Sequence, residues 1–168
     1  MEEKHVVSIL FSRYHSTFSN LIYWISGRGF THASIALDEE NEFYYSFNMK
    51  GFRRECPKHH KNKDSKDICY HLEISEKNFQ QIKMELEEFK RKEKEIGYCR
   101  IGVFLCFLHI SHKFKNRYFC SQFVAEMLGL VDGISLKKDA TLYMPNQLAK
   151  ELACQNIGWE VSYHGQIA

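Results

Sequence analysis

Apolar residues along the chain follow two different periodicities, which indicates that strands and helices are mixed. The run Val6–Phe11 is uncharged and suits a buried strand, and Ile68–Ile74 has apolar residues at every second position, as a strand does. Ser16–Ser26 and Ser75–Glu95 carry apolar residues three and four positions apart, which is typical of amphipathic helices. The mixture predicts an α+β fold.

Two further segments predict a hairpin near the N-terminal end. Thr31–Leu37 and Glu42–Asn48 have the pattern of strands, and the acidic residues 38–41 between them fit a four-residue turn. The following Gly51–Lys66 is polar, basic and without a period, so we expect a loop. Tyr98–Ile110 is apolar throughout, and its pattern fits a buried helix or a strand equally well.

The last third of the chain predicts two short helices and a strand. One helix begins at or beside Cys120 and ends before Gly129, which we expect to adopt a left-handed cap. Pro145 opens a second helix over Asn146–Ala153, because proline is favoured at the first helical position. A strand is expected near Trp159–Tyr163.

Composition narrows the class of protein. With 168 residues, 44% of them hydrophobic, the chain is long enough for one domain spanning residues 1–168. The 23 basic and 21 acidic residues nearly cancel, which argues against nucleic acid as the main partner. The longest uncharged apolar run, Ile101–Ile110, is too short to span a bilayer, so no integral membrane segment is expected. No export signal is visible at the N-terminus, so we expect a cytoplasmic protein whose six cysteines are reduced.

Cys120 is the first candidate for chemistry. It lies at the predicted start of a helix, where unpaired N–H groups and the helix dipole favour an anion. A thiol in this position ionises more readily, and the thiolate is the nucleophilic form. Gln122, one turn further on, is interpreted as a solvent or capping contact.

A base for that thiol is available on a predicted strand. His32 shares one face of its strand with the small residues Ser34 and Ala36, which leave room beside the imidazole. A cysteine–histidine pair also needs a third polar group on the other ring nitrogen. The next strand supplies three candidates on one face, namely Tyr44, Ser46 and Asn48.

These segments resemble a known family. Thr31-His-Ala-Ser-Ile-Ala-Leu-Asp38 followed much later by Tyr118-Phe-Cys-Ser-Gln-Phe-Val-Ala-Glu-Met-Leu128 is similar to the circularly permuted branch of the papain-like NlpC-type superfamily of cysteine peptidases and amidases. In that branch the histidine strands precede the cysteine helix, as His32 precedes Cys120 here. The resemblance implies a permuted papain-like fold, in which a central antiparallel sheet packs against the helix that bears the cysteine.

The resemblance also implies roles for particular residues. Cys120 takes the place of the nucleophile, His32 that of the base, and Ser46 most nearly that of the orienting group. Many relatives carry Glu or His at the orienting position, so the orientation of the ring could come from elsewhere in this chain. Tyr98 resembles the tyrosine that lines the oxyanion site, and Pro145-Asn-Gln-Leu148 resembles a proline-led segment that follows the cysteine helix.

The predicted function is therefore that of a cysteine hydrolase of the peptidase or amidase class. It would cleave an amide or ester through an acyl-enzyme, with a peptide, amide or lipid-like small substrate and no cofactor. One alternative is a non-catalytic binding module of the same fold. Another is a lipid-directed acyltransferase or thioesterase, suggested by the apolar residues 101–110. A zinc site is not expected, because no familiar closed site has the spacing of Cys56, His59, His60, Cys69 and His71.

Overall fold

The structure, a computed structural model, describes residues 4–37, 42–56, 67–155 and 160–163. Its strands are β1 (Lys4–Ser12), β2 (His32–Ala36), β3 (Tyr44–Asn48), β4 (Gly51–Glu55), β5 (Ile68–Ser75), β6 (Gly97–Tyr98), β7 (Arg117–Tyr118) and β8 (Glu160–Tyr163). Its α-helices are α1 (Thr17–Ile25), α2 (Glu76–Arg91), α3 (Arg100–Phe107), α4 (Cys120–Leu128) and α5 (Pro145–Ala153), and a 3₁₀ turn, η2, covers Ala140–Leu142.

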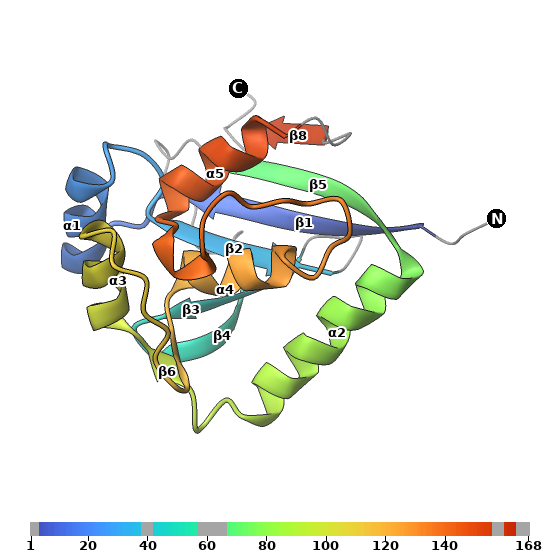
Figure 1. The fold of residues 1–168 in the computed structure, drawn as a ribbon, viewed down its shortest axis with the longest axis horizontal. Coiled ribbons are helices and arrows are strands. Elements are labelled where there is room, and N and C mark those ends of the chain that lie inside the picture. Colours follow the sequence, from blue (N-terminus) through green and yellow to red (C-terminus); the bar gives the residue numbers. More distant parts are fainter. Residues whose placement is uncertain (1–3, 38–41, 57–66, 156–159, 164–168) are drawn as a thin grey trace.

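Six strands form one antiparallel sheet in the order β4-β3-β2-β1-β5-β8, and β6 and β7 form a separate short parallel pair (Figure 1). β1 lies inside the sheet, paired with β2 and with β5. It is buried from Val7 to Ser12, as its uncharged run predicts. The α+β class and the antiparallel sheet are therefore confirmed.

Helices α2, α4 and α5 pack on one face of this sheet. Alternate residues of β1, such as Val7 and Ile9, share a core with Leu86 of α2, Phe123 of α4 and Leu148 of α5. Because alternate strand residues point to the same side, all three helices cover that side. Helix α4, which begins at Cys120, packs against β2 and β3, so the cysteine lies close to the strand of His32.

Helices α1 and α3 lie together at one end of the molecule (Figure 1). They meet in a small separate core formed by Ile22 of α1, Val103 and Cys106 of α3, and the buried Phe119 and Met144. No helix in the described ranges is both long and apolar enough to cross a bilayer. All six cysteines are free thiols.

Local signals located most helix starts correctly. Ser16 and Ser75 accept hydrogen bonds from the amides of Ser19 and Asn78 and so cap α1 and α2, which confirms that helices begin there. Pro145 is the first residue of α5, as predicted. Gly129 has a φ of −63°, so the prediction of a left-handed cap is wrong.

The prediction that residues 51–66 form a loop is wrong at its start, because Gly51–Glu55 forms β4. Gly51 follows the two-residue turn Met49-Lys50 and has a φ of +95°, which glycine adopts at little cost. Phe52 then enters the core and pairs with Phe47 of β3. Polar side chains at the remaining positions hide the strand from a periodicity analysis.

The apolar segment 98–110 is mainly a helix, and this helix is exposed along one side, whereas the pattern predicted a buried helix or a strand. Tyr98 ends β6, and α3 follows over Arg100–Phe107. The predicted acidic turn, residues 38–41, lies outside the described residues, as does Trp159, whereas the predicted last strand is present as β8.

Candidate functional site

Cys120 is the first residue of α4 and is buried, with 3% of its surface exposed. The residue before it, Phe119, is the N-cap, and no side chain caps the first amides of the helix. The leading N–H groups of a helix have no partner within it. They are therefore available to an anion beside the thiol.

The short β6–β7 pair fixes where α4 begins. Tyr98 lies opposite Tyr118 in this pair, and the amide of Cys99 donates to the carbonyl of Tyr118 at 2.8 Å. Two residues later the chain reaches Cys120. At the other side, the Ser121 hydroxyl donates to the carbonyl of Tyr143 at 2.6 Å. The helix start is thus held from both directions.

His32 is the first residue of β2 and is buried against this helix start. The Cys120 thiol lies near enough to this ring to help raise its pKa. Burial by itself lowers the pKa of His32, but the Glu55 carboxylate and Cys120 outweigh it and raise that pKa to about 10. The structure thus places the two predicted residues near each other.

Glu55, the last residue of β4, is the group on the other ring nitrogen. Its Oε2 lies 2.8 Å from His32 Nε2, and both side chains are buried. Burial opposes the charge of Glu55, yet the facing imidazolium and hydrogen bonds from Asn48 and Tyr14 lower its pKa overall. Since Nε2 is held by Glu55, Nδ1 is the nitrogen left for the thiol.

Two more side chains hold Glu55 and His32 in place. The Tyr14 hydroxyl donates to Glu55 Oε2 at 3.1 Å, and Asn48 Nδ2 donates to Oε1 at 3.1 Å. The Tyr14 ring also stacks on the His32 ring, with centroids 4.3 Å apart and planes 18° from parallel. We refer to Tyr14, His32, Asn48 and Glu55 as the polar cluster.

Ser46, predicted to orient His32, does something else. Its hydroxyl is fully buried and donates to the backbone carbonyl of Ala33 at 2.6 Å. It therefore links β3 to β2 and leaves the imidazole to Glu55. Of the other candidates, Asn48 acts on Glu55, and the Tyr44 hydroxyl lies 3.5 Å from Cys69 Sγ.

Glu55 was missed because it lies in the segment predicted to be a loop. Knowing that β4 is a strand would not have predicted the contact between Glu55 and Asn48. In the register of the hairpin Glu55 pairs with Tyr44, at the end far from Asn48. Four residues of extended strand span about 13 Å. The hydrogen bond from Asn48 to Glu55 therefore requires the β3–β4 hairpin to bend. The available signal was the turn Met49-Lys50, which puts Asn48 and Glu55 on one face.

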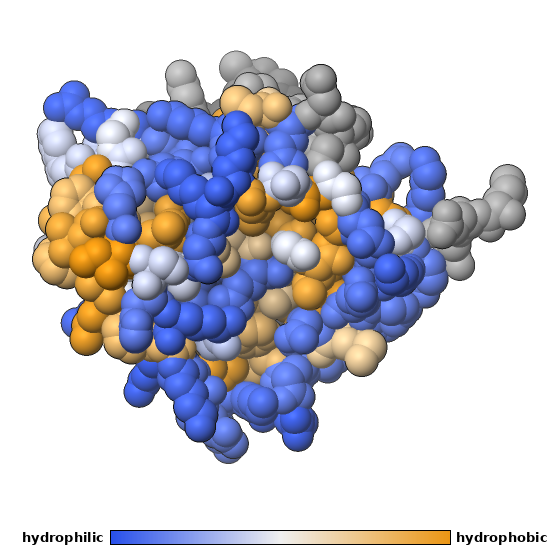
Figure 2. Space-filling model, in the orientation of Figure 1, coloured by the Kyte–Doolittle hydropathy of each residue, from blue (hydrophilic) through white to orange (hydrophobic). Residues whose placement is uncertain are grey.

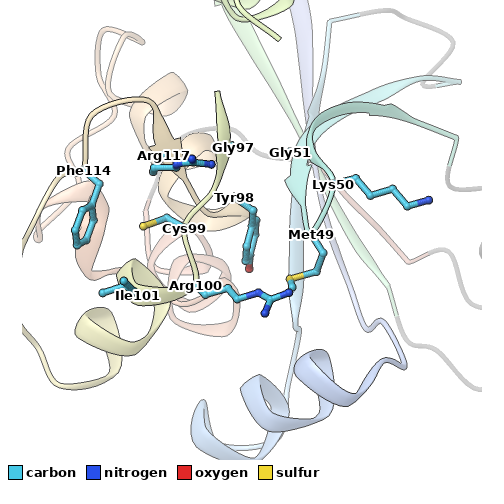
Figure 3. Close-up of a pocket in the computed structure, with 10 residues that line it drawn as sticks. All are labelled: Met49, Lys50, Gly51, Gly97, Tyr98, Cys99, Arg100, Ile101, Phe114 and Arg117. Atoms are coloured by element: carbon cyan, nitrogen blue, oxygen red, sulfur yellow. The ribbon is translucent and has the colours of Figure 1, made fainter. Parts of the chain in front are cut away.

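Tyr98 lies beside this site and lines a pocket of about 640 Å³ between β6, α3 and the β3–β4 turn (Figure 3). Burial raises the pKa of its hydroxyl well above the usual range, and the nearby Cys120 contributes to the rise. In Figure 3 the ring extends into the space between Arg100 and Met49. The pocket wall also includes Lys50 and Arg117.

The proline-led segment packs beside the cysteine helix and braces α1. The side-chain Nδ2 of Asn146 in α5 donates to the carbonyl of Ser26 at 3.2 Å. Gln147 accepts from the Met144 amide at 3.3 Å and so caps its own helix. Gln122 is buried and donates to Glu126 one turn along α4, at 3.0 Å. Its predicted solvent contact is thus replaced by an intrahelical one.

The residues suggested for zinc do not gather into a site in the described part of the chain, where no three His, Cys, Asp or Glu side chains are placed to hold a metal ion. His71 instead lies 2.8 Å from the hydroxyl of Ser8. His59 and His60 lie outside the described residues.

Comparison with known proteins adds no family assignment to this geometry: no family model, curated protein or solved structure matches the chain.

Proposed function

We propose that this chain is a cysteine-dependent hydrolase of an amide or ester, with Cys120 as nucleophile, His32 as base and Glu55 as the orienting acid. The observation that carries the proposal is that the buried His32 ring lies 2.8 Å from the Glu55 carboxylate and near enough to the Cys120 thiol for that thiol to help raise its pKa. A nucleophile, a base and a third group that fixes the base are the components of acyl transfer. The order of His32 before Cys120 supports a permuted papain-like fold.

In the first step the proton of the Cys120 thiol passes to His32. Since the pKa of His32 is raised to about 10, the imidazolium persists at neutral pH and stabilises the thiolate beside it. Glu55 balances the charge of the ring and fixes its plane. The thiolate sulfur then attacks the substrate carbonyl carbon, and a C–S bond forms.

The tetrahedral oxyanion would be held at the uncapped start of α4. The Cys120 amide points out of the helix start, and the Tyr98 hydroxyl at the pocket is a second donor. Collapse of the intermediate breaks the bond to the amine or alcohol, which takes the proton from His32. Water, deprotonated by His32, then attacks the thioester, the C–S bond breaks, and the carboxylic acid leaves.

We infer the kind of substrate from the pocket that Tyr98 lines. Cys120, His32 and Glu55 are not part of its wall, so Tyr98 is the residue that connects this pocket to the proposed site. Arg100 and Arg117 contribute cations to its wall, whereas Ile101 and Phe114 contribute apolar surface. The Lys50 side chain extends away from the other lining residues (Figure 3). No carboxylate is among the described residues that line it. A small peptide, amide or lipid-like molecule with an anionic group and an apolar part would complement this lining.

A second candidate function is acyl transfer from a lipid. It differs only in the acceptor that resolves the acyl-enzyme, and the apolar exposed surface of α3 favours it over a strictly peptide-directed reaction. A non-catalytic module is the third possibility. It is less favoured, because a buried ion pair such as Glu55–His32 adds little stability beyond what apolar packing in its place would give. Stability alone therefore does not explain this pair beside a thiol.

Alkylation by iodoacetamide at pH 6.5, read by mass spectrometry of each cysteine peptide, tests the proposal. We expect Cys120 to react at least about tenfold faster than an ordinary thiol, which is mostly protonated at that pH. Glu55→Gln and His32→Gln should remove this advantage. Cys154, which is exposed, is the internal control in each sample. A Cys120 rate no higher than that of Cys154, or one unchanged in His32→Gln, would falsify the proposal.

A further inference from the structure

The ends of α1 and α3 carry large apolar side chains that the protein does not cover. Ile101 and Phe104 of α3 and Leu108 at its C-cap recur at helical spacing and are 62%, 58% and 46% exposed. On α1, Trp24 is 63% exposed and Leu21 53%. Figure 2 shows the hydrophobic surface that these helices form at one end of the molecule. We call these five residues, with Phe107 and Ile110, the α1–α3 face.

Helix α3 is apolar on both sides, which is unusual for a helix at a surface. Its inner side, with Val103 and Cys106, packs against Ile22 of α1. Its outer side carries the exposed residues of the α1–α3 face. A helix that is hydrophobic all round is normally covered on all sides, by protein or by lipid. The outer side therefore lacks its partner.

The charge around the face is of one sign. From Lys4 to Leu37 and from Gly97 to Ala125 the sequence contains no Asp or Glu. Arg28 follows α1 and Arg100 begins α3, both exposed, and neither forms an ion pair within the ranges that the structure describes. The carboxylates that reach the α3–β7 connection from elsewhere, Glu126 and Asp139, are already engaged by Lys113 and Thr141.

Aromatic rings and arginines are paired at the border of the face. The Arg28 guanidinium lies 4.6 Å from the Trp24 ring, and that of Arg13 lies 3.8 Å from the Tyr23 ring. Tryptophan and tyrosine are enriched where one end of a side chain is in lipid and the other in water. Cations at the same level attract acidic headgroups.

We propose that the α1–α3 face docks on the surface of a lipid bilayer that contains anionic lipids. The exposed apolar side chains enter the acyl boundary, while Arg28 and Arg100 contact phosphate groups. A second copy of this chain fits less well, because its own cationic border would oppose Arg28 and Arg100. Ile101 belongs both to the face and to the pocket wall, so docking places the mouth of the pocket near the headgroups.

Sedimentation of the full chain with sucrose-loaded vesicles tests this proposal. We expect binding to vesicles of phosphatidylcholine and phosphatidylglycerol at 3:1. Binding should fall strongly with phosphatidylcholine alone or in about 0.5 M NaCl, which screens charges beyond a few ångströms. The double variant Phe104→Ser/Leu108→Ser should bind at least about tenfold more weakly, because burying one large apolar side chain is worth a factor of this size or more.

The matched control is Met84→Ser. Met84 is 71% exposed but lies on α2, away from the α1–α3 face, so its removal should leave binding unchanged. Cys120→Ala should also bind normally, because docking does not depend on the proposed chemistry. Absence of binding to the mixed vesicles, or equal binding by the double variant, overturns the proposal. It is equally overturned if the protein is a dimer in sedimentation equilibrium and the double variant is a monomer, since a second copy then covers the face.

Discussion

The β3–β4 hairpin contributes to two interiors of opposite character. On one face, Phe47 and Phe52 join Phe89 and Phe123 in an aromatic cluster whose ring centroids lie 5.0 to 5.7 Å apart. On the other face, Asn48 and Glu55 belong to the polar cluster around His32. The same hairpin thus contributes to the aromatic cluster and to the polar cluster, because successive strand residues point to opposite sides.

The two clusters differ in how much depends on each contact. Ring packing in the aromatic cluster is the sum of many weak dispersion contacts, so shape and volume matter more than any single pair. In the polar cluster each bond is directional, and loss of one partner leaves another buried group unsatisfied. We therefore expect the aromatic cluster to determine stability and the polar cluster to determine reactivity. The predictions below test that division.

The largest expected effect on stability comes from Phe123→Ala. Phe123 is fully buried and contacts three other rings of the aromatic cluster. Truncation of a buried phenylalanine costs about 3–5 kcal/mol of unfolding free energy, measured by urea denaturation. Phe123→Leu, which fills more of the cavity, should cost clearly less. A loss below about 1 kcal/mol for Phe123→Ala would mean that the cluster can collapse around the gap.

Raising the pH should weaken the protein through the polar cluster. The pKa of His32 is about 10 in the folded chain and 6.5 as a model value, so between these values the folded state holds the extra proton. The stabilisation is complete below pH 6.5 and is lost as the pH rises through 10, with a slope of up to about 1.4 kcal/mol per pH unit. Urea melts across this range measure it.

The matched variant for the pH experiment is His32→Gln. Its unfolding free energy should lack the decrease with pH that the His32 ring contributes between pH 6.5 and 10. Glu55 behaves in the opposite sense. Because its pKa is lowered from 4.5, its contribution is present above that value and is lost as the pH falls through the folded pKa. Identical pH profiles for the protein and His32→Gln would show that the ring does not gain its proton on folding.

A smaller loss is expected for Tyr14→Phe. This change removes the hydrogen bond to Glu55 and keeps the ring that stacks on His32. The change should lower the free energy of unfolding by about 1 kcal/mol. It should also raise the pKa of Glu55, so that acid unfolding begins at a higher pH. Tyr23→Phe is the control, since the contact of Tyr23 with Arg13 is made through its ring. Equal effects of the two changes would argue against a special role for the Tyr14 hydroxyl.

Ser46→Ala should affect reactivity least. The Ser46 hydroxyl binds the Ala33 carbonyl, so its removal should cost about 1 kcal/mol of stability. The rate of Cys120 alkylation and the pKa of His32, followed by NMR of the ring, should not change. A fall in the alkylation rate as large as that of Glu55→Gln would return the orienting role to Ser46.

The sequence predicted the parts of the site that depend on local structure. Cys120 at a helix start and His32 on a strand follow from periodicity and from the end of an apolar pattern, which are properties of neighbouring residues. Their separation of 88 positions did not prevent the prediction, because the resemblance to a permuted fold supplied the long-range pairing. In the structure the two residues lie near each other, and Cys120 helps to raise the pKa of His32.

The third group could not be predicted in the same way. Glu55 follows Arg53 and Arg54 in a segment without a period, and it reaches His32 through the bend of the β3–β4 hairpin. The bend of a two-stranded hairpin depends on the side chains that pack on both of its faces. Sequence periodicity within the hairpin does not reveal those long-range contacts. Tyr14 was missed for a related reason, since it lies in the connection that follows β1.

The parallel pairing of β6 with β7 has a consequence for how this protein can change. The amides of Gly97 and Cys99 bond to the carbonyls of Asn116 and Tyr118, so the chain leaves and re-enters the body of the molecule at adjacent points. Residues 99–116, including α3, form an excursion that is closed at its base. Changes of length or polarity within these residues should therefore leave the start of α4, and with it the position of Cys120, unaltered.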